Sequence, residues 1–102
     1  MGSSRYLCSD LVTLKRASGP CVVNLEEISE TLAVFEAEGP FDVREQLCIE
    51  CEGAPFHGFV STVEKHEFGW RIEMELSPLT PWSPERFRPR HLLDIATLPK
   101  LE

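Results

Sequence analysis

Two cysteines and two histidines lie close together in the middle of the chain, and both residue types bind zinc. Cys48 and Cys51 have the Cys-x-x-Cys spacing, and His57 and His66 follow them. A structural zinc ion needs four thiolate or imidazole ligands around one point, often from two such Cys-x-x-Cys turns. The chain contains only one pair at this spacing.

The residues around this cysteine pair alternate as they do in a β-strand. Leu47, Ile49 and Cys51 are separated by Cys48 and polar residues within 45–52. Residues three apart on a strand point to opposite faces of the sheet, so the two thiols would not reach one metal ion. We interpret the cysteines as small apolar residues of a sheet and predict no metal site, with a zinc-stabilised domain as the alternative.

No arrangement of residues typical of catalysis is found. Ser29 and Ser61 lack the Gly-x-Ser-x-Gly turn that exposes a nucleophile. The three histidines form no His-x-His or His-x-x-x-His pair, and no two carboxylates are marked as an acid–base couple. We therefore predict that the protein is not an enzyme and that its histidines are surface or hydrogen-bonded residues.

Apolar residues recur in short runs that end at glycine, proline or charged residues. The clearest run is 68–76, in which every second residue is apolar, the pattern of a half-buried strand. The predicted strands are 5–14, 21–28, 31–36, 45–52, 56–65 and 68–76. Six short strands with tight connections favour an all-β barrel or sandwich. We predict a six-stranded antiparallel β-barrel over residues 1–76.

Four aromatic residues fall near the predicted hairpin of the last two strands: Phe56, Phe59, Phe68 and Trp70. Exposed aromatics interleaved with basic residues would suggest binding of single-stranded nucleic acid. The interleaved charges here are mostly acidic. We therefore expect these aromatics to pack in the core.

A proline-rich segment follows the last predicted strand, and we assign residues 77–102 to a tail that packs on the barrel. Ser83 is a good N-cap and Pro84 a good first helical residue, so 84–88 is predicted as a short helical turn. A second turn is expected over 90–96. The apolar residues predicted to dock on the barrel are Trp82, Phe87 and Leu92.

Composition excludes several functional classes. The 102 residues fit one domain. The formal charge is 10 − 17 = −7, which argues against binding to duplex DNA or RNA, because phosphate contacts need Lys and Arg. No apolar run is long enough for a membrane span. The first residues lack the features of a signal peptide, so we expect a cytoplasmic protein with reduced thiols.

Charge is unevenly distributed along the chain. Residues 26–52 contain nine acids against the single cation Arg44. Near the C-terminus, Arg86, Arg88 and Arg90 follow one another at every second position. Both clusters fit solvated faces. The arginines are also a candidate patch for an acidic partner, an anionic ligand or the acidic side of the domain itself.

Four sequence features together resemble the PilZ domain. They are Arg5-Tyr6, Glu27-Ile28-Ser29, Phe56-His57-Gly58-Phe59-Val60 and Phe68-Gly69-Trp70-Arg71-Ile72-Glu73-Met74. The similarity covers roughly residues 1–76. It implies a six-stranded β-barrel used in bacterial cyclic di-GMP signalling, where the family controls motility, surface attachment or polysaccharide output.

The ligand-binding signature of that family is only partly present. Its Arg-x-x-x-Arg motif falls on residues 1–5, where only Arg5 matches. Its Asp/Asn-x-Ser-x-x-Gly motif falls on residues 27–32, where Glu27 replaces the shorter acid or amide, Ser29 is kept and Leu32 replaces glycine. The resemblance implies that Arg5, Glu27 and Ser29 are the ligand-binding positions. No cofactor is predicted apart from cyclic di-GMP as a possible ligand.

These departures predict a degenerate member of the family. Each lost charge-assisted contact removes roughly 1.5–3 kcal/mol of binding free energy. We therefore expect a non-catalytic signalling or adaptor module with a protein partner and with weak or lost cyclic di-GMP binding. A genuine cyclic di-GMP receptor and a structural interaction domain unrelated to the nucleotide are the alternatives.

Overall fold

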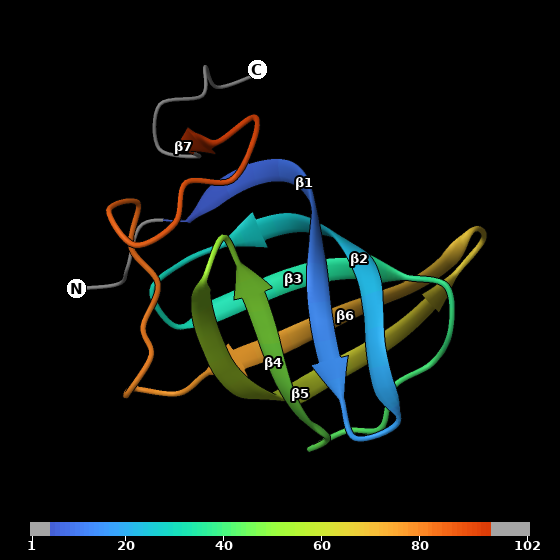
Figure 1. The fold of residues 1–102 in the computed structure, drawn as a ribbon. Helices are drawn as coiled ribbons and strands as arrows, with labels where there is room; N and C mark the ends of the chain where they lie inside the picture. Colours follow the sequence, from blue (N-terminus) through green and yellow to red (C-terminus); the bar gives the residue numbers. More distant parts are fainter. Residues whose placement is uncertain (1–4, 95–102) are drawn as a thin grey trace.

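Seven strands account for most of residues 5–94, the part of the chain that the computed structural model describes (Figure 1). Their bounds are β1 (Tyr6–Arg16), β2 (Gly19–Ile28), β3 (Leu32–Ala37), β4 (Gln46–Cys51), β5 (Ala54–His66), β6 (Gly69–Leu76) and β7 (Leu93–Asp94). The first six strands pair antiparallel in the order β1–β2–β3–β6–β5–β4, and β4 pairs with β1 to close the ring. This arrangement confirms the predicted six-stranded antiparallel barrel.

Tight hairpins join several neighbouring strands of the ring. Cys51 of β4 pairs with Ala54 of β5, which leaves Glu52 and Gly53 as a two-residue loop between these strands. Both turn residues have positive φ angles, +49° and +85°. Positive φ at both positions characterises the two-residue hairpin loop whose twist matches that of the flanking strands.

Alternate residues of each strand point into the barrel and form one apolar core. In β4 the buried residues are Leu47, Ile49 and Cys51, whereas Cys48 is only partly buried on the opposite face. The predicted alternation and the role of Cys51 as a core residue are therefore confirmed. The largest fully buried side chains are Phe35, Phe56, Leu14, Leu25, Ile28, Ile49, Ile72 and Met74.

One end of the barrel is closed by the segment that follows β6. Trp82 and Phe87 are buried in the core cluster, and Leu92 packs against it, as predicted. The Trp82 indole N–H donates to the carbonyl of Phe87 at 2.9 Å. The indole ring also meets Tyr6 edge-on, with ring centroids 5.3 Å apart. The C-terminal segment thus completes the core.

The opposite end is closed by an arginine and an aromatic ring. The guanidinium of Arg16 lies 3.7 Å from the ring centroid of Phe41, which is buried. The same guanidinium donates to both carboxylate oxygens of Glu45, at 2.6 and 2.9 Å. Such a two-pronged ion pair is among the stronger polar contacts in proteins.

The predicted C-terminal helical segment is reduced to one hydrogen-bonded turn. The amides of Arg86 and Phe87 both donate to the carbonyl of Ser83, at 3.0 and 3.2 Å. Pro89 lacks the N–H that a continuing helix needs. The second predicted turn, over 90–96, is wrong at residues 93–94, because these form β7, and residues 95–96 lie outside the described residues.

β7 forms where β1 has a free edge. β4 pairs only with residues 13–15 of β1, so the first residues of β1 are open on that side, and β7 pairs there with Tyr6 and Leu7.

Residues 5–94 contain no helix that could cross a membrane.

Candidate functional site

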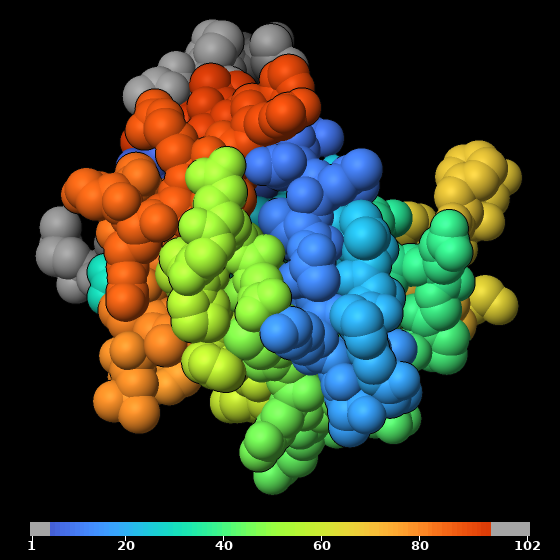
Figure 2. Space-filling model, viewed as in Figure 1, coloured from blue at the N-terminus to red at the C-terminus, as the bar shows by residue number. Residues whose placement is uncertain are grey.

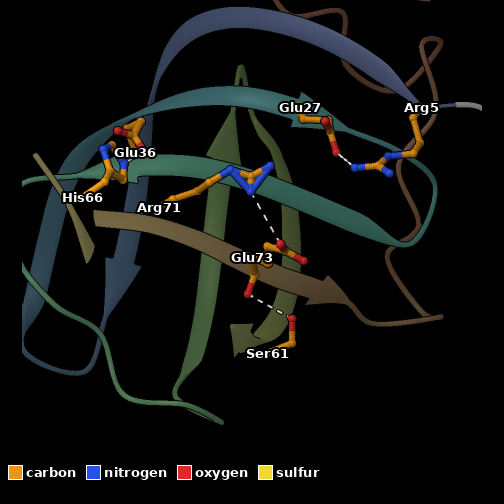
Figure 3. A network of polar contacts seen from close by, with 7 residues as sticks. All are labelled: Arg5, Glu27, Glu36, Ser61, His66, Arg71 and Glu73. Atoms are coloured by element: carbon orange, nitrogen blue, oxygen red, sulfur yellow. Dashed lines mark hydrogen bonds and ion pairs between the residues drawn. The ribbon is translucent and has the colours of Figure 1, made fainter. Parts of the chain in front are cut away.

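Two of the residues that the resemblance assigns to ligand binding, Arg5 and Glu27, meet at the start of β1 and the end of β2 (Figure 3). Antiparallel pairing places Leu7 opposite Glu27, so Arg5 lies near the same carboxylate. The Arg5 guanidinium and the Glu27 carboxylate form an ion pair. Only 11% of the Glu27 side chain is exposed, against 53% for Arg5. Two of the three predicted positions are therefore brought together, and they contact each other.

The third predicted position, Ser29, belongs to the turn between β2 and β3. Its hydroxyl accepts a hydrogen bond from the backbone N–H of Leu32 at 3.1 Å. Its own backbone N–H donates to the carbonyl of Leu32 at 2.8 Å. Ser29 is buried. Its hydroxyl oxygen is thus already engaged in holding the turn. The remaining motif position, at the first residue of the chain, lies outside the described residues.

A second polar network covers the outer face of β3 and β6 (Figure 3). His66 and Glu36 contact each other at 2.8 Å between Nε2 and a carboxylate oxygen. Arg71 lies 3.5 Å from Glu73 in the neighbouring pair. Burial, together with the nearby Glu36 carboxylate, raises the pKa of Glu26 above its usual value. The expectation that His66 is a hydrogen-bonded surface residue is confirmed, and its ring is engaged with Glu36.

The cysteines are placed for packing. All four are free thiols. Burial is the main cause that raises the pKa of Cys8 and of Cys51 to about 12, with nearby acids adding to the effect. These two thiols are therefore protonated near neutral pH and are weak nucleophiles. Cys48 and Cys51 lie on opposite faces of β4, so they do not converge on one point.

The three C-terminal arginines differ in their surroundings. The Arg86 guanidinium donates to the carbonyl of Pro81 at 2.9 Å and lies 5.9 Å from the ring centroid of Phe56. The backbone N–H of Arg90 donates to the carboxylate of Asp10 at 3.1 Å. Arg88 is exposed. Arg86 is thus partly used to hold its own loop, and the candidate patch stays a prediction.

Sequence reasoning missed an open groove on the outside of the barrel, here called the β4–β5 groove. It has a volume of about 1030 Å³ and lies along the outer faces of β4 and β5. Figure 2 shows this side of the molecule, with β4 (green) between β1 (blue) and β5 (yellow-green). The lining residues that matter for its chemistry are Lys15, Arg16, Arg44, His57, Phe59 and Glu75.

Two of the aromatics expected in the core are instead exposed. Phe56 is buried and Trp70 packs against the core, as predicted. Phe59 is 42% exposed and lines the β4–β5 groove, and Phe68 is 89% exposed at the tip of the β5–β6 hairpin. That hairpin stands away from the body of the molecule in Figure 2 (gold). The alternation of β5 explains the first exception, because Phe56 points inward and Phe59, three residues later, points outward.

No protein-family model matches this chain, and no curated protein matches it either. The barrel alone does not define a function, because one fold hosts many activities. The likeness to the PilZ domain therefore rests on the sequence features quoted above and on a barrel with the same number of strands.

Proposed function

We propose that this chain is a non-catalytic bacterial signalling or adaptor module of the PilZ type, in which direct cyclic di-GMP binding is weak or lost. The observation that carries the proposal is the ion pair between Arg5 and Glu27. The arginine that would bind the dinucleotide is neutralised by the acid that would share the site. We further propose that the module acts through a protein partner.

Binding of cyclic di-GMP at this place would require the ion pair to open. Glu27 is nearly buried, and a buried carboxylate that loses its partner is strongly destabilised. A ligand phosphate would also be repelled by this carboxylate. Each charge-assisted contact is worth roughly 1.5–3 kcal/mol, so the loss of one lowers affinity about tenfold or more. The Ser29 oxygen already accepts from the Leu32 N–H, so the contact that Ser29 can still offer a phosphate is its O–H as a donor.

The thiols support a binding role over a catalytic one. The pKa of Cys8 and of Cys51 lies far above neutral pH, which leaves little thiolate for nucleophilic attack. Free cysteines also fit the reducing bacterial cytoplasm in which we place this module.

The test is calorimetric titration of cyclic di-GMP into the protein at low salt. We expect no saturable heat with the unchanged protein or with Arg5→Glu. Glu27→Asn releases Arg5 and restores a residue type of the family motif, so we expect it to bind measurably. Glu38→Asn, which neutralises an exposed acid elsewhere, is the matched control and should stay silent.

Saturable micromolar binding by the unchanged protein, abolished by Arg5→Glu, would contradict the proposal. The chain would then be a genuine cyclic di-GMP receptor. Silence of every variant, Glu27→Asn included, would show that more than the ion pair blocks the nucleotide and would favour an interaction domain with no link to it.

A further inference from the structure

More cations than carboxylates line the β4–β5 groove, within a chain of net charge −7. Its lining includes the cations Lys15, Arg16 and Arg44 against the carboxylate Glu75. Lys15 forms an ion pair with Glu50 at 3.0 Å, and Arg16 forms one with Glu45. Arg44 has no side-chain partner among residues 5–94. The groove therefore offers one uncommitted guanidinium to an outside anion.

The backbone at Arg44 adds a second, independent observation. Its φ angle is +74°, in the left-handed region that is unfavourable for any residue with a Cβ atom. Backbone hydrogen bonds hold this geometry, because Arg44 N–H donates to Val60 O at 2.7 Å and Val60 N–H donates to Glu45 O at 2.9 Å. Glycine would adopt the same geometry without strain. What arginine contributes here is its side chain.

An exposed aromatic ring lies in the same groove. Phe59 pairs with Gln46 on β4 and with Glu75 on β6, and its ring is 42% exposed. Val43, next to Arg44, is also exposed and lines the groove. Aromatic and apolar side chains held in a hollow are the usual anchors of a binding surface. The groove thus combines an apolar centre with a cation beside it.

The geometry indicates the size and conformation of the occupant. β4 pairs with β5 along its whole length and with β1 from Cys48 to Glu50, so its open edge beside the groove is only Gln46 and Leu47, too short for an added strand. The occupant must be recognised through side chains. The groove is open, whereas small-molecule sites enclose most of their ligand. A chain segment lying across the outside of the barrel fits it better than a small molecule.

We infer that the β4–β5 groove binds a short acidic segment of a partner protein. An aromatic or aliphatic side chain of that segment packs on Phe59 and Val43, and a carboxylate pairs with Arg44. This inference rests on the proposed function and deepens it, because it gives the chemistry of the partner that an adaptor module needs.

The test uses a synthetic peptide rich in glutamate with one central tryptophan. The ¹⁵N-labelled protein is titrated with this peptide up to millimolar concentration, and amide shifts are followed by NMR. We expect saturable shifts confined to the neighbourhood of Arg44, Gln46 and Phe59. Binding should weaken with added salt, because a charge pair contributes to it.

Two variants test the two parts of the groove. Arg44→Gly relieves the backbone strain and removes the cation, so we expect an unchanged or higher melting temperature and at least about tenfold weaker binding. Phe59→Ser removes the exposed ring and should weaken binding to a similar degree. Lys65→Gln removes one positive charge at an exposed lysine outside both the groove and the C-terminal arginine patch, and it should bind as the unchanged protein does.

Several outcomes would overturn the inference. They are no shifts around the groove at millimolar peptide, equal binding of a peptide with lysine in place of glutamate, and equal losses of binding in Arg44→Gly and Lys65→Gln. Displacement of the peptide by a second copy of the chain, or by guanosine monophosphate, would assign the groove to those occupants instead. The calorimetric titration reports on Arg5 and Glu27 at the ends of β1 and β2, so either proposal can fail while the other stands.

Discussion

Arg5 and Arg44 are both exposed arginines of an acidic chain, yet only one of them is available to a ligand. Arg5 enters β1 opposite a nearly buried carboxylate, and the two charges neutralise each other. Arg44 sits in the turn before β4, where its backbone φ of +74° belongs to the left-handed region and its side chain has no ion-pair partner among the described residues. The comparison indicates that pairing across strands decides which arginine is left free to contact a ligand.

The difference follows from the elements that hold each arginine. Strand pairing fixes the neighbour of a residue on a sheet, so Arg5 meets Glu27 once β1 and β2 are in register. A turn residue has no such opposite neighbour. The positions that the resemblance assigns to ligand binding are thus held in an ion pair, whereas the β4–β5 groove, which contains none of those positions, is open.

The largest effect is expected from Trp82→Ala, which removes the ring that contacts Tyr6, next to Arg5. Truncation of a buried tryptophan costs about 3–5 kcal/mol of unfolding free energy. Chemical denaturation measures the loss, and Trp82→Phe should recover most of it. Amide hydrogen exchange in Trp82→Ala should speed up most at the start of β1. Faster exchange around the β4–β5 groove than at the start of β1 would show that the two regions are not independent.

Glu45→Gln tests the end of the barrel beside the groove. Glu45 accepts two hydrogen bonds from Arg16, and this contact lowers the pKa of Glu45 below its usual 4.5. The stabilisation is therefore present above pH 4.5 and is lost as the pH falls through the lowered pKa. We expect the substitution to cost about 2 kcal/mol near neutral pH. A difference that persists in strong acid would contradict this account.

Glu27→Gln would leave Arg5 without an anionic partner, as Arg44 is in the unchanged protein. It removes the negative charge that Arg5 faces, and we expect a loss of about 1 kcal/mol, because the arginine is half exposed and the pair is partly screened. Thermal denaturation at low and high salt measures it. High salt should shrink the difference between the two proteins, and a gap independent of salt would point to packing instead.

The smallest effect on stability is expected from Arg44→Gly, which should stabilise the protein, unlike the three substitutions above. Left-handed backbone costs a residue with a Cβ atom roughly 1–2 kcal/mol, while glycine loses more chain entropy on folding. The balance should raise the unfolding free energy by up to about 1 kcal/mol. Arg88→Gly relieves no left-handed backbone strain, so it should leave the unfolding free energy unchanged or lower it. A destabilised Arg44→Gly would mean that the arginine supports the fold.

The sequence predicts the barrel well because its strands alternate clearly. Leu47, Ile49 and Cys51 point inward as expected, and Trp82 docks on the core. The ion pair of Arg5 with Glu27 depends on strand register, which residue types do not specify. β7 was missed because it has only two residues, and they form a strand only by pairing with the free edge of β1. The groove was missed because its lining comes from β1, β4, β5 and β6 and from the turn before β4, and only the folded barrel brings these outer side chains together.

The closed ring also governs the order in which a newly made chain can fold. β1, β2 and β3 can pair in the order in which they are synthesised, but the second edge of β3 must wait for β6, and the second edge of β1 must wait for β4 and β7. A nascent chain that stops before Leu76 therefore carries open strand edges, which are templates for aggregation. Contacts between distant parts of the chain slow folding. We expect this barrel to form as one cooperative event after most of the chain has left the ribosome.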